Sequence, residues 1–289
     1  MKRASAQHEP LRPSRLRTAL GWCVHFYTAL GLVAAAGIAV LMVPNNGLVS
    51  SEGAAFRWAF ILMLIATLID ATDGTLARAV RIKEVLPGFD GRRLDDLVDF
   101  LNYTFLPLCL IWRAGLLPEG TEFVLLLPLL ASAYGFCQVS IKTDDGYFLG
   151  FPSYWNVIAF YLYVLQPLPG WFSLVVILLF ALLTFVPTRY LYPSQKGRLN
   201  RWTNLLGAPW AGMLVGVLWV LPSATPDASG DGAASRLALA SLFFPVYYLV
   251  VSWAISWRMW HAKRRRRSDK KDSPQRHREH REDKRQNEE

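Results

Sequence analysis

Apolar residues occur along this chain in long, nearly unbroken blocks that are separated by short polar connections. Blocks of about 20 residues match the hydrocarbon thickness of a bilayer, where a helix satisfies its own backbone hydrogen bonds. The fifth block is the weakest, because YWNVIAFYLYVLQ is short and is followed by Pro167 and Pro169. The pattern predicts an all-α fold, a polytopic membrane helical bundle with about eight transmembrane helices, near residues 19–43, 54–78, 95–115, 122–141, 154–166, 171–188, 203–221 and 236–257.

Basic residues divide the connections into two kinds. Lys and Arg gather at both ends of the chain and in the segments around 78–94, 142–153 and 189–201, whereas the other connections hold few. Cytoplasmic loops carry such an excess, so both termini and these three segments are predicted to lie in the cytoplasm. The chain then divides into a basic cytoplasmic N-terminal segment (1–18), a membrane domain (19–260) and a basic cytoplasmic tail (261–289) of disordered composition.

Composition changes this picture little. The net charge of +9 would also suit a nucleic acid, but the basic residues flank membrane helices and there face anionic lipid headgroups. We therefore predict anionic lipids as partners and no nucleic acid. Cys23, Cys109 and Cys137 all lie in apolar spans, without the spacing of a disulfide framework or a metal site.

Aspartates stand at the facing ends of the second and third predicted helices, where a carboxylate is costly unless a positive partner meets it. On an ideal helix over residues 54–80, two carboxylates, two small residues and one guanidinium share a stripe: Asp70, Asp73, Gly74, Ala77 and Arg78. On the next helix, three positions spaced by four residues share a face: Gly91, Asp95 and Asp99. The two helices thus each present a pair of carboxylates.

Any one of these aspartates could be a helix cap or a solvated residue, but the matched spacing of all four favours a site. Four converging carboxylates cannot all stay ionised without cations, and oxygen-only ligands favour Mg²⁺ or Mn²⁺. A pair of ions suits displacement at phosphorus, because it stabilises both the attacking and the leaving oxygen. Gly74 and Ala77 leave a bare helix face, and Arg78 offers a forked donor to phosphate. The stripe predicts a nucleotide-diphosphate site.

The full pattern reads Asp70-x2-Asp73-Gly74-x2-Ala77-Arg78-x12-Gly91-x3-Asp95-x3-Asp99. It resembles the signature of the CDP-alcohol phosphotransferases, which are integral membrane enzymes of phospholipid synthesis. Most members have a shorter spacing between the Arg and the second Gly. The spacing of twelve residues here, with KTDDGYFLGFPSYWN (142–156) and VPTRYLYPS (186–194), is similar to the bacterial phosphatidylcholine synthases within that family.

The resemblance implies transfer of the phosphatidyl group from CDP-diacylglycerol to choline with release of CMP, in the bacterial inner membrane, with the active site facing the cytoplasm. It implies two divalent ions, Mn²⁺ or Mg²⁺, and a general base at Asp99. Family members tend toward homodimers, so the resemblance also implies a homodimer. The implied metal ligands are Asp70, Asp73, Asp95 and Asp99, and the positions implied to accommodate the CDP moiety are Gly74, Ala77, Arg78 and Gly91.

The choline and lipid contacts follow less directly. Choline has no hydrogen-bond donor on its cationic head, so aromatic faces are expected to hold it. Tyr154 and Trp155 are the leading candidates and Tyr103 is another, although each also fits an interfacial aromatic belt. Arg189 is the leading candidate for a phosphate contact, because it lies close to an apolar span; plain positive-inside charge is the alternative.

Two other functions stay open at this point. Serine, inositol or glycerol 3-phosphate could replace choline, and a phosphorylated alcohol would demand extra basic residues near the motif. A divalent-cation transporter would also carry intramembrane carboxylates, but near the middle of the membrane and on several helices.

Overall fold

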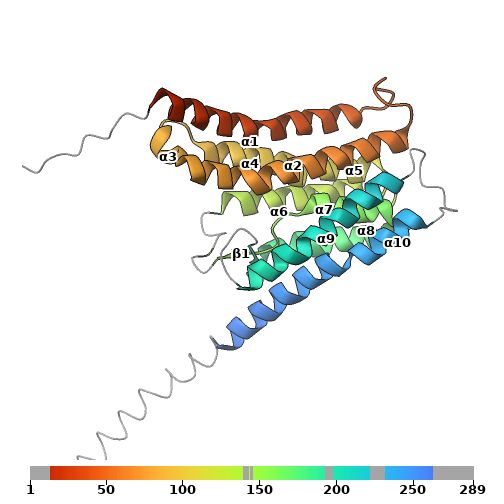
Figure 1. The fold of residues 1–289 in the computed structure, drawn as a ribbon. Coiled ribbons are helices and arrows are strands. Elements are labelled where there is room, and N and C mark those ends of the chain that lie inside the picture. The colour runs from red at the N-terminus through yellow and green to blue at the C-terminus, as the bar shows by residue number, and fades with distance from the viewer. Residues whose placement is uncertain (1–13, 139–142, 144–145, 193–197, 222–231, 263–289) are drawn as a thin grey trace, which may run out of the picture.

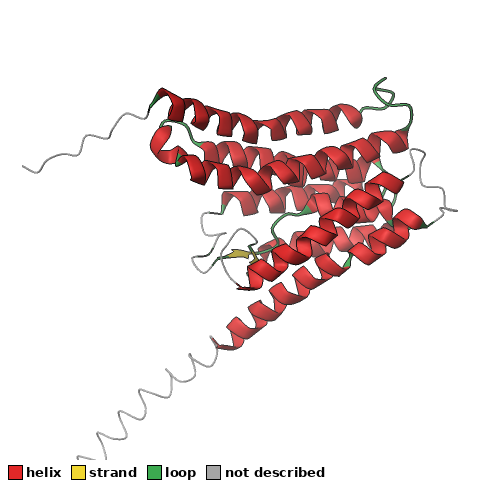
Figure 2. Ribbon diagram, viewed as in Figure 1, coloured by secondary structure: helices red, strands yellow, loops and turns green. Residues whose placement is uncertain are grey.

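The computed structural model describes residues 14–138, 143, 146–192, 198–221 and 232–262. Most of the predicted N-terminal segment and nearly all of the predicted C-terminal tail lie outside the described residues. Helices dominate what is described (Figure 2). In chain order the α-helices are α1 (Arg15–Leu41), α2 (Glu52–Val80), α3 (Ile82–Val85), α4 (Gly91–Asp99), α5 (Leu106–Arg113), α6 (Leu126–Cys137), α7 (Trp155–Val164), α8 (Gly170–Phe185), α9 (Arg198–Val220) and α10 (Ala233–Ser241).

The apolar blocks of the sequence are helical, which confirms the predicted helical class. Among the described residues, four helices are long and apolar enough to cross a membrane: Arg15–Leu41, Glu52–Val80, Leu199–Val220 and Ala233–Ala262. The last of these continues α10 through residues 243–262. Shorter apolar helices cover Glu122–Cys137, Trp155–Val164 and Gly170–Phe185. The count of about eight spans and the cytoplasmic side of the termini stay predictions.

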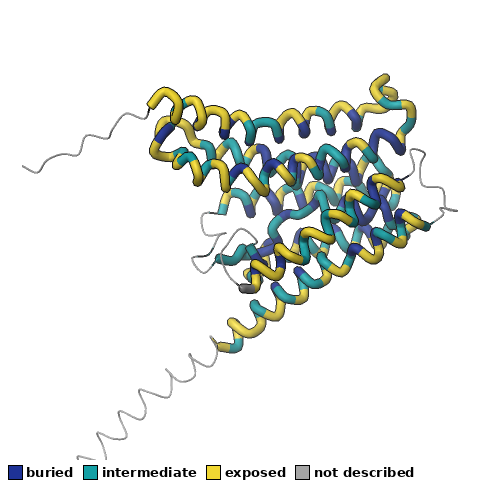
Figure 3. The backbone as a smooth tube through the Cα atoms, viewed as in Figure 1, coloured by how far each residue is buried: buried dark blue, intermediate teal, exposed yellow. Residues whose placement is uncertain are grey.

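Many residues along the helices are exposed (Figure 3), and large apolar side chains are among them. On α1, Phe26 and Val33 are 69% and 66% exposed, and on α9 Trp219 is 79% exposed. Contiguous exposed apolar surface of this extent is rare on soluble monomers and marks contact with an apolar partner or a membrane. Lipid tails would cover these faces, so they agree with the membrane character of the chain.

Local signals explain where the first two long helices begin and where α2 ends. Ser14 caps α1 by accepting from the backbone N–H of Arg17, and Ser51 caps α2 by accepting from that of Ala54. Helix α2 ends at Val80, and the next residue, Arg81, has a left-handed backbone (φ 54°). The chain turns there into α3 and the connection to α4.

Helices α4 and α5 are joined without a break by a π-helix, η1 (Phe100–Phe105). Pro107 lies in the first turn of α5 and has no N–H to donate to the carbonyl of Tyr103 four residues earlier. The N–H of Leu106 instead bonds to the carbonyl of Leu101, five residues back. This local widening places Tyr103 just beyond Asp99, and π-helical turns of this kind occur frequently at functional sites.

A small antiparallel sheet, which the sequence did not predict, joins two of the basic connections. Strand β1 (Tyr147–Leu149) pairs with β2 (Arg189–Leu191), with Phe148 opposite Tyr190. Gly150 follows β1 with φ +82°, and a Cβ there would overlap the carbonyl oxygen of Thr184. The connections before α7 and after α8 therefore lie together, on the side of the bundle where α1 begins (Figure 1).

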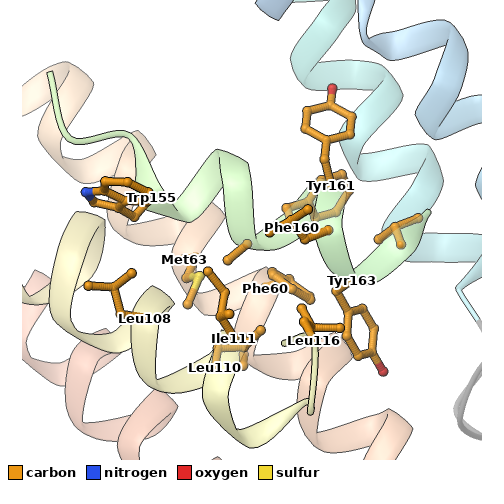
Figure 4. Close-up of a cluster of buried hydrophobic side chains, with 14 of the residues drawn as sticks. Phe60, Met63, Leu108, Leu110, Ile111, Leu116, Trp155, Phe160, Tyr161 and Tyr163 are labelled. Atoms are coloured by element: carbon orange, nitrogen blue, oxygen red, sulfur yellow. The ribbon is translucent and has the colours of Figure 1, made fainter. Parts of the chain in front are cut away.

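The core lies where α2, α5 and α7 meet (Figure 4). The rings of Phe60 and Phe160 meet edge to face at 5.3 Å, and Leu110 and Ile111 have no exposed surface. Helix α7 is enclosed by its neighbours, since Trp155 and residues 159–164 are all buried. Its Tyr161 hydroxyl shares a hydrogen bond with Ser241 of α10 and accepts one from the Trp210 indole of α9.

Candidate metal centre

Three carboxylates from two helices meet in one place. Asp70 of α2 and Asp95 and Asp99 of α4 each offer an oxygen, and these oxygens all lie within 4.8 Å of one another. All three residues are half-buried. The spacing of four residues puts Asp95 and Asp99 on one face of α4, as the sequence predicted. We call this group the acidic triad.

The donor set of the acidic triad fits a hard divalent cation. Every ligand atom it offers is a carboxylate oxygen, and no His or Cys belongs to the group. Mg²⁺ and Mn²⁺ prefer such ligands, whereas softer metals select nitrogen and sulfur. A cluster that could hold a metal is thus confirmed for three of the four aspartates; which metal it holds stays a prediction.

Asp73, the fourth aspartate of the motif, faces α1. Its side chain is buried, and its Oδ2 accepts a hydrogen bond from the Thr28 hydroxyl at 2.8 Å. Beside it, the hydroxyls of Tyr27 and Thr72 meet at 2.8 Å. Asp73 does not belong to the acidic triad. The sequence pattern alone could not separate it from Asp70, because both fall on one helical stripe.

Tyr103 of η1 contacts the acidic triad directly. Its hydroxyl donates to Oδ2 of Asp70 at 2.7 Å. The same hydroxyl lies next to Thr67 of α2, and the Thr67 hydroxyl lies 3.5 Å from the Asn156 amide of α7. A chain of polar contacts therefore runs from the triad to α7. The sequence marked Tyr103 only as an aromatic candidate.

The small residues of the motif have different surroundings. At Gly74 an added Cβ would meet only the Arg78 guanidinium, at 3.3 Å, and that guanidinium donates to the Thr75 hydroxyl at 3.0 Å. Ala77 lies on the same part of α2 and is partly buried. The helix surface at Gly74 and Ala77, which was predicted to lack large side chains, therefore lies next to the exposed side chain of Arg78.

Gly91 packs against α1. A Cβ at this position would overlap the imidazole of His25, which is only 6% exposed. The His25 ring also meets Phe89, at 4.3 Å between centroids. The connection between α2 and α4 thus covers the cytoplasmic end predicted for α1, and Gly91 is the position that lets α4 approach. The contact between Gly91 and His25 could not be predicted from the sequence, because His25 is a single histidine within an apolar span.

The two leading choline candidates lie in different surroundings. Tyr154 precedes α7 and is partly exposed, with its ring 6.5 Å from that of Tyr103 and 6.0 Å from that of Tyr248. Trp155 has no exposed surface, and its indole N–H donates to Ser132 at 2.8 Å. Trp155 therefore presents no face to a ligand in this structure, which leaves Tyr154 as the choline candidate of the pair. Sequence reasoning missed Tyr248, which lies in the last helix, far along the chain.

Arg189 belongs to β2. Its backbone N–H donates to Ser256 at 2.6 Å, and its guanidinium lies 5.8 Å from the centroid of the Tyr147 ring. A guanidinium nitrogen also lies 3.1 Å from the sulfur of Met259. These contacts connect the small sheet to the last helix, and Arg189 is partly buried among them.

Comparison with known proteins gives several relatives of one kind. The phosphatidylcholine synthase of Pseudomonas aeruginosa is 39% identical over 181 residues, which cover 62% of this chain and 72% of the relative. That of Legionella bozemanae is 44% identical over 147 residues, or 50% of this chain and 67% of the relative. The chain belongs to the phosphatidylcholine synthase family. A third family member, from Bradyrhizobium diazoefficiens, is 36% identical over 206 residues, or 71% of this chain and 73% of the relative.

The protein-family models show no match to the chain. Membership in the phosphatidylcholine synthase family confirms the prediction that was made from the spacing of twelve residues between Arg78 and Gly91.

Proposed function

We propose that the protein is a phosphatidylcholine synthase that transfers the phosphatidyl group of CDP-diacylglycerol to choline and releases CMP. The observation that carries this proposal is the convergence of the acidic triad in a chain that belongs to this family. The Tyr154 ring, which lies 6.5 Å from that of Tyr103, supports choline as the alcohol, because aromatic faces attract a quaternary ammonium.

The four aspartates of the motif would hold two divalent cations, Mn²⁺ or Mg²⁺. Bound there, the cations would neutralise negative charge on the diphosphate as it is cleaved. Asp70, Asp95 and Asp99 already converge, and Asp73 lies one turn further along α2 from Asp70, where Thr28 bonds to its carboxylate. The carboxylates thus supply the negative charge that would bind the cations, and the bound cations would in turn attract the negatively charged diphosphate.

Asp99 is the proposed general base. Its carboxylate accepts the proton of the choline hydroxyl while the hydroxyl oxygen attacks the β-phosphorus, which bears the diacylglycerol. A new P–O bond forms, the phosphoanhydride bond breaks, and CMP leaves with the bonding electron pair. Asp99 suits this role because it ends α4 next to the two other carboxylates and to Tyr103.

Gly74, Ala77, Arg78 and Gly91 are proposed to accommodate the CDP moiety. The Arg78 guanidinium is exposed and uses one nitrogen on Thr75, so further N–H groups of its fork can meet phosphate oxygens. Arg189, on the small sheet, is proposed as a second phosphate contact.

The membrane arrangement is proposed to follow the sequence prediction. The chain would span the bacterial inner membrane about eight times, with residues 19–260 as the membrane domain and both basic ends in the cytoplasm beside anionic lipids. The described part of the chain supports termini on one side, because α1 begins and the last helix ends at the same side of the bundle (Figure 1). A homodimer, toward which the family tends, is part of the proposal.

An alcohol panel tests the function. Purified full-length protein is given labelled CDP-diacylglycerol with choline, ethanolamine, serine, inositol or glycerol 3-phosphate, with and without Mn²⁺. We expect labelled phosphatidylcholine from choline and Mn²⁺ only. A preference for another alcohol would overturn the choline assignment, and Mn²⁺ uptake by proteoliposomes without any lipid product would favour a transporter.

A further inference from the structure

We propose that Tyr103 is a positioning residue that orients the Asp70 carboxylate within the acidic triad and thereby raises the affinity of the site for a divalent cation. The inference rests on the proposed function, because it takes the acidic triad as the cation site. The spacing of the aspartates in the sequence does not predict this role for Tyr103.

The contact between the two side chains is short and specific. The Tyr103 hydroxyl donates to Oδ2 of Asp70 at 2.7 Å, within the range of hydrogen bonds to ionised oxygens. Asp70 projects from α2, whereas Tyr103 projects from η1, which continues α4, so the bond ties α2 to the segment that directly follows the other two carboxylates. A neutral donor in this place satisfies one carboxylate oxygen without adding a competing positive charge.

The hydroxyl of Tyr103 is itself held from several directions. It lies next to the hydroxyl of Thr67, one helical turn before Asp70 on α2, and the Thr67 hydroxyl accepts from the amide of Asn156 at 3.5 Å. The ring of Tyr103 packs at 6.5 Å from that of Tyr154. With these contacts the phenol has few alternative positions, so it can restrict the rotamer of the carboxylate that it bonds.

The orientation of the Asp70 carboxylate matters because negatively charged carboxylates repel one another and turn apart unless a hydrogen bond or a cation holds them. The oxygens of Asp70, Asp95 and Asp99 lie within 4.8 Å of one another, so each carboxylate gains by rotating away from the others. A carboxylate kept in place before the cation arrives is a better ligand than one that must be turned. Loss of such an outer partner typically lowers metal affinity about 10- to 100-fold.

The deciding variant is Tyr103→Phe, which removes the hydroxyl and keeps the ring beside Tyr154. The matched control is Tyr161→Phe, which removes a buried hydroxyl of α7 that bonds to Ser241 and Trp210. Binding of Mn²⁺ to each purified full-length protein in detergent is measured from the electron paramagnetic resonance signal of free Mn²⁺. This readout requires no turnover.

We expect the Kd for Mn²⁺ to rise about 10- to 100-fold in Tyr103→Phe and to stay at the wild-type value in Tyr161→Phe. Excess Mn²⁺ should restore much of the lost turnover of Tyr103→Phe, which a merely structural defect would not allow. If Tyr103→Phe does not fold, Thr67→Val provides the second variant, and it should weaken Mn²⁺ binding in the same direction by a smaller factor.

Wild-type Mn²⁺ affinity in Tyr103→Phe, or lower thermal stability without a change in affinity, would overturn the inference and leave the proposed function intact. A wild-type protein that binds Mn²⁺ but makes no phosphatidylcholine would overturn the proposed function instead. A wild-type protein that binds no Mn²⁺ would overturn the inference together with the metal assignment.

Discussion

Thr28 of α1 donates a hydrogen bond to Asp73 of α2 at 2.8 Å, with both side chains almost fully buried. One carboxylate of the motif is thereby held by a neutral hydroxyl of the neighbouring helix, while the acidic triad forms between α2 and α4. Helix α1, which carries no acidic residue, thus takes part in arranging the site.

Replacing Thr28 with Val keeps the shape of the side chain and removes the donor. The Asp73 carboxylate would lose its Thr28 donor while staying buried, a loss that costs about 1–3 kcal/mol. We expect the midpoint of thermal unfolding in detergent to fall clearly, and turnover to fall with it. The control is Thr184→Val, which loses only a hydrogen bond to the Phe180 carbonyl of its own helix. Equal unfolding midpoints for the two variants would contradict the proposed importance of the contact.

Asp99→Asn should abolish the proposed general base with little change in shape. We expect turnover to fall at least about 100-fold, the lower end for loss of general base catalysis, with CDP-diacylglycerol binding largely retained. The matched control is Asp96→Asn on the same helix, since Asp96 does not belong to the acidic triad. Turnover and lipid binding are measured on the same preparations, with a chelator added in parallel. Near-normal turnover of Asp99→Asn would exclude it as the base, and activity that persists in chelator would exclude the metal.

Gly91→Ala should destabilise the protein because the new methyl group overlaps the His25 ring. Inserting a methyl group into packed structure costs about 1–3 kcal/mol, so we expect a lower unfolding midpoint and lower activity. Gly88→Ala is the matched control, because a Cβ at Gly88 meets nothing within 4 Å. Adding His25→Ala to Gly91→Ala should recover part of the lost stability. The packing explanation fails if Gly91→Ala unfolds at the same temperature as Gly88→Ala.

Tyr154→Leu should weaken choline binding by removing an aromatic face next to Tyr103. A cation–π contact contributes about 0.5–2 kcal/mol, so we expect the KM for choline to rise about 2- to 30-fold. The KM for CDP-diacylglycerol should stay unchanged, and Tyr154→Phe, which keeps the face, should bind choline nearly as wild type does. Kinetics with each substrate varied in turn provide the measurement. A KM for choline in Tyr154→Leu equal to that of wild type would remove Tyr154 from the choline site.

The helices and the motif could be predicted from the chain because both depend on local spacing. Apolar blocks of membrane length indicate helices wherever they occur, and these blocks are helical in the structure. The spacing of four residues between Asp95 and Asp99 is enough to place them on one face of a helix. The aspartate motif, the twelve residues between Arg78 and Gly91, and the segments 142–156 and 186–194 together predicted the family.

Only the tertiary structure decided which of the aspartates converge and what holds each of them. Asp70 and Asp73 share one stripe of α2, yet Asp70 bonds to Tyr103 and Asp73 to Thr28, because α4 packs beside one and α1 beside the other. The same holds for Gly91, whose need for a bare α-carbon comes from His25, more than sixty positions earlier in the chain. Contacts between distant segments depend on how helices pack, and a repeat along one helix carries no information about the neighbour that covers it.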